Sequence, residues 1–337
     1  MPQKRIQDPD IIDLALIEQA LNENFEVIVQ FSDNTYTDKI LRELNELCLG
    51  YNENFTIRFY GHHRSIFDCK TLRKITNVKS LGVDCLIKAQ NIDSLTKLDQ
   101  LKKLRLGIYE LKDTEILSAE NFKKLNRLVI GDTKTRALNL EYLKHYHDLT
   151  YLMICGHTKN IDVVGELKRL DFLSLNSISK VSLNFVNRLP ALKILRIILG
   201  GRPNINEINN DKIEHLELIW IRGLNDLSNI STFKKLKSLL IQDQIQLSSI
   251  HFDTALPGLT DCKILNCKTL GSLTGINNLN SLNQLRISKT TIDFDSFIKQ
   301  ELPQSLKILA FYTSKSKIDK QIKAVLQIKG FSDGLDR

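Results

Sequence analysis

The stretch FKKLNRLVIG at residues 122–131 returns almost letter for letter as FKKLKSLLIQ at residues 233–242. Each copy has a basic pair followed by alternating apolar residues, which is typical of a short strand with one buried face. A structural period would recur in the residues between the two copies, whereas shared chemistry would leave the same reactive groups in both.

The period is found when the chain is aligned on the frame apolar-x-x-apolar-x-apolar. Successive frames are 21 to 24 residues apart over ten steps, and the two quoted copies lie five repeats apart on this ladder. Steps this regular indicate stacked repeats, so architecture explains the repetition. The eleven frames start at Val78, Leu101, Leu125, Leu149, Leu170, Leu192, Ile213, Leu236, Leu259, Leu282 and Leu306.

Positions 4 and 6 of each frame are apolar in nearly every repeat, for example Leu195 and Ile197. Side chains on a strand alternate with period two, so these two positions point to the same side. One strand of this length cannot bury such a face alone. Stacked as parallel strands, the repeats bury their faces against one another, and a return segment closes each coil.

This frame resembles that of the leucine-rich-repeat family, in its short-repeat class of 21 to 24 residues, over roughly residues 78–313. The resemblance implies an α/β fold: a leucine-rich-repeat solenoid shaped as a curved horseshoe. Its parallel β-sheet would form the concave face, and short helical or 3-10 returns would form the convex face. The family usually has Asn at position 9, and this chain does not, so we expect irregular turns after the strands.

The ends of the chain differ from the repeats, as the terminal caps of a solenoid must. Asp8-Pro9 favours a helix start, residues 25–31 alternate like a strand, and residues 40–48 fit one face of a helix. Ser316 with Asp319 resembles a capping box before a final helix. We therefore expect three parts: an α/β N-terminal cap continuous with the solenoid (1–65), the solenoid of about eleven units (66–314), and a C-terminal capping helix and tail (315–337).

Composition is that of an ordinary soluble protein, with 337 residues, 42% hydrophobic and 26% charged. No run of 18 apolar residues occurs, and residues 1–21 lack the pattern of a signal peptide, so we expect no membrane span and a cytoplasmic location. The six cysteines form no CxxC pair and are expected to be reduced thiols. The net charge of +8 favours an acidic partner.

The concave surface should be formed by positions 3, 5, 7 and 8 of each repeat. In the middle repeats these positions hold large apolar and aromatic residues, which on a soluble protein mark an interaction site. Two alternatives remain open: a frame slip in repeats six and seven would make some of them core, or a cap or return could cover them. The predicted partner-binding residues are Tyr151, Met153, Phe172, Ile194, Arg196, Ile198, Glu217, Trp220 and Leu240, with a basic rim of Lys103, Arg105 and Arg127.

Motifs for catalysis or metal binding are weak. His145-x-His147 with His157, and His62-His63, contain imidazoles that could bind zinc, but no further ligand has a matching spacing, so solvated histidines are the better interpretation. Cys155 and Cys267 lack a matching His and acid for a nucleophile. No phosphate-binding, serine-hydrolase or zinc-protease motif occurs. We expect no catalytic residues, no metal and no cofactor, and hence no enzyme.

The sequence therefore predicts a monomeric, non-catalytic module that binds another protein, possibly an acidic one, on its concave face. One alternative is an immunity or antitoxin-type protein, or an enzyme-regulatory inhibitor, directed at a cognate acidic protein. Another is nucleic-acid binding through a basic ridge. Interleaved acidic residues and the lack of an RNA-binding motif make the ridge the weaker prediction. The ridge pairs are Lys102-Lys103, Lys123-Lys124, Lys168-Arg169 and Lys234-Lys235.

Overall fold

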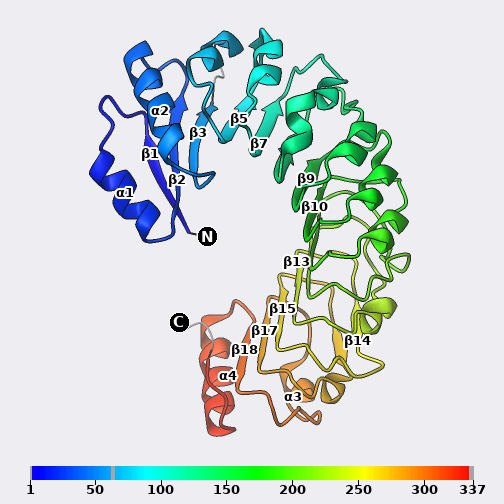
Figure 1. Ribbon diagram of the computed structural model, residues 1–337. Coiled ribbons are helices and arrows are strands. Elements are labelled where there is room, and N and C mark those ends of the chain that lie inside the picture. Colours follow the sequence, from blue (N-terminus) through cyan, green and yellow to red (C-terminus); the bar gives the residue numbers. More distant parts are fainter. Residues whose placement is uncertain (1, 62–64, 334–337) are drawn as a thin grey trace. The chain divides into compact units, whose positions relative to one another are not determined.

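The computed structural model describes residues 2–61 and 65–333. The chain folds into two compact units, Met1–Leu170 and Asp171–Arg337, and each contains a main parallel sheet whose strands follow chain order (Figure 1). The sheet of the first unit consists of β1 (Gln3–Gln7), β2 (Glu26–Ser32), β3 (Phe55–Tyr60), β5 (Ser80–Leu86), β7 (Lys103–Ile108), β8 (Arg127–Ile130) and β9 (Tyr151–Cys155). The sheet of the second unit consists of β10 (Phe172–Asn176), β11 (Ile194–Ile198), β12 (His215–Ile219), β13 (Ser238–Gln242), β15 (Asp261–Leu265), β17 (Gln284–Ser288) and β18 (Ile308–Tyr312).

Each of the eleven sequence frames produces one strand, beginning with β5 and ending with β18. In β11 and β12 the burial alternates residue by residue, so Leu195 and Ile197 lie in the core while Ile194 and Ile198 lie half-buried on the other side. The frame is therefore confirmed, and repeats six and seven have not slipped.

The return segments lie behind each sheet and are mostly 3-10 helices, as predicted. Some returns are short strands instead, because neighbouring returns pair with each other in parallel: β4 (Phe67–Asp68) with β6 (Ala89–Gln90), and β14 (Ser249–His251) with β16 (Ser272–Thr274). The 3-10 helices are η1 (Cys69–Lys74), η2 (Ile92–Lys97), η3 (Ile116–Ser118), η4 (Glu120–Lys124), η5 (Leu140–His145), η6 (Ile161–Glu166), η7 (Asn184–Arg188), η8 (Ser228–Thr232) and η9 (Ile276–Asn278).

The N-terminal segment continues the sheet, because β1, β2, β3 and β5 pair in parallel in this order. Helix α1 (Leu14–Asn22) and helix α2 (Asp38–Gly50) connect these strands. The predicted helix start at Asp8-Pro9 is wrong. Asp13 caps α1 by accepting a hydrogen bond from the Leu16 N–H at 3.0 Å. Asp8 has a left-handed φ of 45° and instead accepts a bond from the Ser32 N–H at 2.7 Å.

The turns after the strands of the second unit share one backbone conformation, so the expectation of irregular turns is wrong there. Six consecutive repeats place a residue with φ between 49° and 61° directly after the strand. In each case its N–H donates to the last carbonyl of the next strand, at 2.7 to 2.9 Å. We call these the turn residues: Ser177, Leu199, Trp220, Asp243, Asn266 and Lys289.

Other side chains replace the missing asparagines at position 9. Buried Gln244 donates to the carbonyls of Leu218 and Gln242 at 3.0 and 2.8 Å, and the thiol of Cys267 contacts two carbonyls in the same way. Further amides lie in the return segments, where Asn121, Asn210 and Asn229 each donate to two carbonyls of the preceding return. The backbone groups that a solenoid interior would leave unsatisfied are thereby paired.

His157 occupies position 9 in its repeat and is fully buried. Its Nδ1 accepts from the Leu138 N–H at 3.3 Å, and its Nε2 lies 3.1 Å from the Gly131 carbonyl. Burial lowers the pKa of His157 below its ordinary value of 6.5, since a charged imidazolium would lose its hydration. The neutral ring is thus the form that fits this turn.

Replacing His157 is expected to change how the stability of the protein depends on pH. The unfolded chain protonates His157 at higher pH than the folded chain does, so the free energy of unfolding falls as the pH drops below about 6.5, by at most about 1.4 kcal/mol per pH unit. This part of the decline ends below the folded-state pKa. The variant His157→Asn can still form hydrogen bonds with the turn, and we expect it to lack this part of the decline in stability. Urea unfolding at neutral and mildly acidic pH measures the difference, and exposed His145→Asn should behave like wild type.

The C-terminal segment covers the last strand. Helix α3 (Phe294–Phe297) precedes β18, and helix α4 (Ser316–Ile328) packs on β18 through buried Ile322 and Leu326. The predicted capping box at Ser316 is wrong, because Lys315 is the N-cap and makes no side-chain bond. The carboxylate of Asp319 instead accepts from the Thr313 N–H at 2.7 Å. The boundaries at residues 65 and 314 stay predictions.

Candidate functional site

We use the term open face for the side of each sheet that is turned away from the returns and presents positions 3, 5 and 7 of the frame. The open face of the second unit carries a contiguous apolar cluster formed by Ile198, Leu199, Ile219 and Trp220. Ile198 and Ile219 are directly opposite each other in register on β11 and β12. Leu199 and Trp220 follow them as turn residues. The cluster therefore spans the ends of two neighbouring strands and the turns that follow.

The two turn residues of the apolar cluster have no structural reason to be large and apolar. Trp220 is 58% exposed and Leu199 is 38% exposed, so neither fills the core. Their φ values of 49° and 61° are left-handed, a conformation that costs an ordinary L-residue about 1–2 kcal/mol and suits Gly, Asn or Asp. Other turns of this unit use Asp243 and Asn266, as that preference predicts. Backbone preference and packing both argue against Leu and Trp here.

A hollow of about 300 Å³ adjoins Trp220. Ile245, which is 53% exposed, lines it together with Asp243, Asn266 and Lys268. Apolar surface thus continues from the apolar cluster into a depression edged by one acidic and one basic side chain. This is the shape and composition of a surface that receives a protruding side chain.

Several of the predicted partner-binding residues are engaged within the protein. Phe172 is only 8% exposed, because the Arg196 guanidinium lies over its ring at 5.1 Å from the centroid. Arg196 also forms an ion pair with Glu217 at 2.8 Å, directly opposite in register. Ile194 and Leu240 are half-buried on the same open face. The prediction of Phe172 as a solvent-facing anchor is therefore wrong, whereas Ile198 and Trp220 are accessible.

Tyr151 and Met153 lie on β9 in the first unit, half-buried on its open face. The Arg127 guanidinium lies 3.9 Å from the centroid of the Tyr151 ring. The predicted set is thus divided between the two units, with these two residues in the first and the others in the second.

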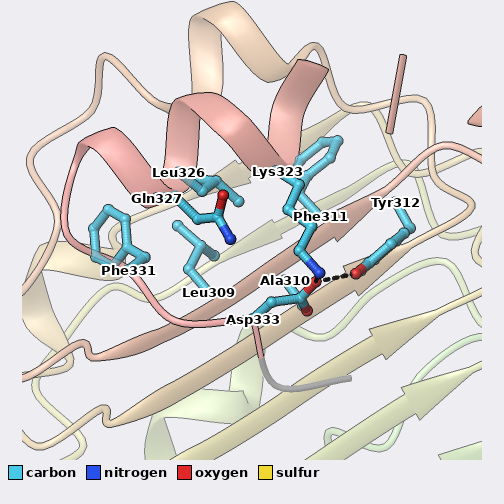
Figure 2. Close-up of a pocket in the computed structure, with 9 residues that line it drawn as sticks. All are labelled: Leu309, Ala310, Phe311, Tyr312, Lys323, Leu326, Gln327, Phe331 and Asp333. Atoms are coloured by element: carbon cyan, nitrogen blue, oxygen red, sulfur yellow. Dashed lines mark hydrogen bonds and ion pairs between the residues drawn. The ribbon is translucent and has the colours of Figure 1, made fainter. Parts of the chain in front are cut away.

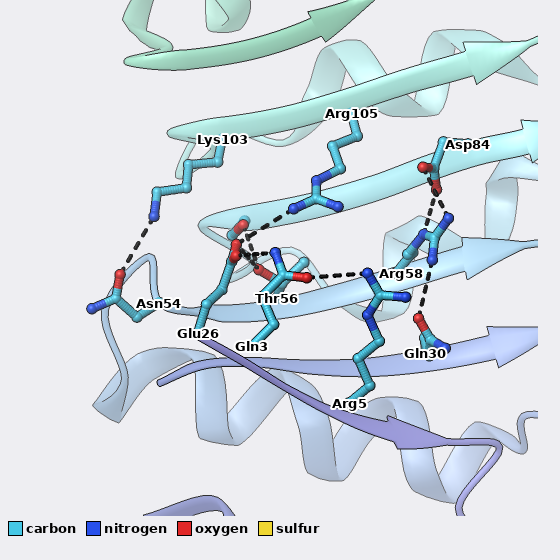
Figure 3. Close-up of polar contacts among 11 residues, drawn as sticks. Gln3, Arg5, Glu26, Gln30, Asn54, Thr56, Arg58, Asp84, Lys103 and Arg105 are labelled. Carbon is cyan, nitrogen blue, oxygen red and sulfur yellow. Dashed lines mark hydrogen bonds and ion pairs between the residues drawn. The ribbon is translucent and has the colours of Figure 1, made fainter. Parts of the chain in front are cut away.

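The open face of the first unit is polar and internally bonded (Figure 3). Arg58 forms a two-pronged pair with Asp84, at 2.6 and 3.1 Å. Glu26, almost fully buried, accepts hydrogen bonds from Gln3 at 2.7 Å and from Thr56 at 3.5 Å. The acidic groups on this face are therefore already satisfied by neighbours.

Lys103, Arg105 and Arg127 lie on β7 and β8 of this open face and are half-buried, so they are not an exposed rim. Apart from Lys103, the residues of the predicted basic ridge lie elsewhere, near the starts of the strands. There Lys123 pairs with Glu120 at 2.5 Å and Arg169 pairs with Asp148 at 2.7 Å. Two of the eight ridge cations thus have an acidic partner.

The residues considered for metal binding or catalysis do not lie together in one site. His145 and His147 are exposed, His157 is buried in its turn, and His62-His63 lie outside the described residues. Within residues 2–61 and 65–333, no group of three or more His, Cys, Asp or Glu side chains could hold a metal ion. Burial raises the pKa of the Cys267 thiol to about 11, so it is protonated at neutral pH.

A pocket between β18 and α4 is too small for a ligand. Figure 2 shows that Leu309, Phe311, Leu326 and Phe331 surround it, and its volume is about 10 Å³, less than a small organic molecule requires. An ion pair between Lys323 and Asp333 at 3.0 Å lies at its edge. It is a packing gap of the C-terminal cap.

Comparisons with known proteins bear on the fold. No family model and no curated protein matches the chain. Among solved structures, an internalin (inlF) of Listeria monocytogenes is similar with a TM-score of 0.59 and 20% identity, over 92% of this chain and 87% of that one. A leucine-rich-repeat protein of Leptospira interrogans matches with a TM-score of 0.45 and 12% identity, over 89% and 88%.

The repeat frame, the parallel sheets and the likeness to the internalin agree that this chain has the leucine-rich-repeat fold, an α/β solenoid. At 20% identity the likeness concerns the fold alone. None of the helices in the described part of the chain is long and apolar enough to cross a membrane.

Proposed function

We propose that the protein is a non-catalytic module that binds another protein through the open face of its second unit. The observation that carries this proposal is the placement of Leu199 and Trp220, which are large, exposed and held in a left-handed conformation that favours small polar residues. Sequences that break a local rule without a structural gain do so at functional positions. An apolar surface kept at an energetic cost is best explained by a partner that covers it.

The chemistry of the surface favours a protein partner. Trp and Arg are the commonest binding anchors at protein interfaces, and Trp220 and Arg196 lie on adjacent repeats. The hollow beside Trp220 offers a place for one side chain of the partner. Ile198 and Ile219 provide apolar surface between Trp220 and Arg196. The ion pair of Arg196 with Glu217 would set the polar specificity at the edge of the contact.

The test is affinity capture from native lysate with wild type and with the double variant Leu199→Asn/Trp220→Asn. Asn suits the left-handed turn, so the variant should keep or raise the melting temperature while it removes both apolar side chains. We expect one protein to be retained by wild type and lost by the variant. With the isolated partner, calorimetry should show that Trp220→Asn weakens binding by about 2 kcal/mol or more, roughly 30-fold.

The matched control is Lys289→Asn, which changes a turn residue of the same unit with φ of 55° but removes no apolar side chain. It should bind like wild type. Equal retention by the double variant would contradict the proposal, and so would recovery of nucleic acid instead of protein.

We further propose a monomer located in the cytoplasm. All six cysteines are free thiols, and four of them are buried. Free thiols persist in a reducing compartment. The net charge of +8 supports an acidic partner.

A further inference from the structure

Two like charges face each other on the open face of the first unit. Lys103 on β7 and Arg127 on β8 are directly opposite in register, and Arg105 lies on the same face two residues further along β7. Like charges placed directly opposite across a sheet are destabilising. We call Lys103, Arg105 and Arg127 the basic cluster. A neutral residue at either position would remove this repulsion and stabilise the sheet.

The basic cluster has unused hydrogen-bonding capacity. Within the described residues, Lys103 Nζ has one long contact, to Asn54 Oδ1 at 3.4 Å (Figure 3). Arg105 forms an ion pair with Glu26, but at 3.7 Å this pair is too long to be a hydrogen bond. The Nε of Arg127 is buried and has no hydrogen-bond partner in the described part of the chain. Each of the three cations therefore has hydrogen-bonding capacity that its described neighbours leave unused.

The electrostatic surroundings agree with this geometry. Burial lowers the pKa of Lys103, and the charges of Arg127 and Arg105 lower it further, while Glu53 and Glu26 act in the opposite direction. An anion placed against the basic cluster would relieve the repulsion among the three cations. It would gain charge-assisted bonds in a site that is partly shielded from solvent.

Two glycines leave the open face without side chains next to the basic cluster. Gly107 follows Leu106 on β7, and Gly131 follows the last residue of β8. A Cβ on Gly131 would lie 2.9 Å from the Gly107 Cα, so the close approach of the two backbones requires glycine. These two positions carry no side chain that could cover the sheet, and an extended peptide could lie close to it.

We propose that the basic cluster is a binding site for an acidic, extended segment of a protein partner, whose carboxylates would pair with Lys103, Arg105 and Arg127. This inference rests on the proposed function, because it assigns part of the partner to the first unit. The charges of the face support it: Glu26 and Asp84 already accept hydrogen bonds from their neighbours, and the ion pair of Arg105 with Glu26 is as long as 3.7 Å. Among the described residues, Lys103 and Arg127 form no ion pair, so an incoming carboxylate can pair with them.

A nucleic acid fits this face less well. Its phosphates form a continuous line of charge, whereas the cations here occupy two neighbouring strands and are followed along the sheet by Asp84 and Glu26. A backbone crossing the sheet would meet these carboxylates. Two or three carboxylates on a short peptide segment match the size of the basic cluster better.

The test measures binding of fluorescein-labelled deca-glutamate to the full chain by anisotropy at low ionic strength. We expect binding by wild type and a loss of about tenfold or more in Lys103→Gln/Arg127→Gln. The control Lys102→Gln/Lys124→Gln removes the same charge from the same two repeats but at exposed positions at the starts of the strands. It should weaken binding much less. Circular dichroism should show that both variants remain folded.

Three outcomes would overturn the proposal: no binding of deca-glutamate, equal weakening by both double variants, or tighter binding of a ten-nucleotide oligothymidylate that is lost in Lys103→Gln/Arg127→Gln. A variant of the apolar cluster distinguishes failure of this proposal from failure of the proposed function. Leu199→Asn/Trp220→Asn should bind deca-glutamate like wild type. If the apolar cluster has no role, capture is unchanged in that variant while deca-glutamate binding still depends on Lys103 and Arg127.

Discussion

Phe122→Ala and Phe233→Ala are each expected to lower the free energy of unfolding by about 3–5 kcal/mol. These are the phenylalanines that open the two FKKL segments, and they are 0% and 1% exposed. Phe122 lies in η4 and Phe233 follows η8, so each ring fills the core between a return and its sheet. Truncation would leave a cavity that a short, tightly bonded return cannot close.

Because Phe122 lies in the first unit and Phe233 in the second, the pair also tests how cooperatively the chain unfolds. Urea unfolding followed by circular dichroism is the measurement. Phe→Leu at either position should cost less than about 1.5 kcal/mol, since most of the volume is kept. Lys123→Ala and Lys234→Ala should change little, because they remove partly or fully exposed side chains. Losses below about 1 kcal/mol for Phe→Ala would refute the assignment of these rings to the core.

Gly200→Ala is expected to destabilise the second unit by about 2–4 kcal/mol. Gly200 has φ of 79°, and a Cβ there would lie 2.4 Å from the Ile178 carbonyl oxygen, a backbone atom that cannot move aside. Since Gly200 directly follows Leu199, the substitution should also displace the apolar cluster and weaken partner binding. Thermal unfolding and calorimetry measure the two effects.

The neighbouring glycine is the natural control for this prediction. Gly201 has ordinary space around it, because a Cβ there would lie 3.7 Å from its nearest neighbour, the Arg222 carbonyl oxygen. Gly201→Ala should therefore leave both stability and binding close to wild type. Similar losses for the two alanine variants would show that the positive φ of Gly200 is not the cause.

The repeat architecture could be predicted from the sequence because burial on a short strand depends on period two alone. The frame starting at Leu192 correctly separated the buried Leu195 and Ile197 from the half-buried Ile194 and Ile198. Signals of this kind lie within six consecutive residues. The turns could not be predicted in this way, because the left-handed φ of Trp220 depends on the Gln242 carbonyl of the following strand, a partner 22 residues away.

The accessibility of the proposed binding residues was only partly predictable, for the same reason. Trp220 and Ile198 follow from their positions in the frame, but the burial of Phe172 depends on the conformation that Arg196 takes on the next strand. The bonds of Gln244 and His157 were missed because the prediction considered only Asn at position 9. A search for any buried hydrogen-bonding side chain at that position would have found them.

The uneven burial of the thiols has a practical consequence for spectroscopy. Cys48, Cys69, Cys262 and Cys267 are buried, and burial raises the pKa of Cys48 to about 12, so reagents that need a thiolate will spare such residues. Cys85 is exposed, at the end of β5 beside the pair of Arg58 with Asp84. A maleimide dye would thus attach preferentially at Cys85. The native sequence already provides an attachment point from which a fluorophore can report on the first unit.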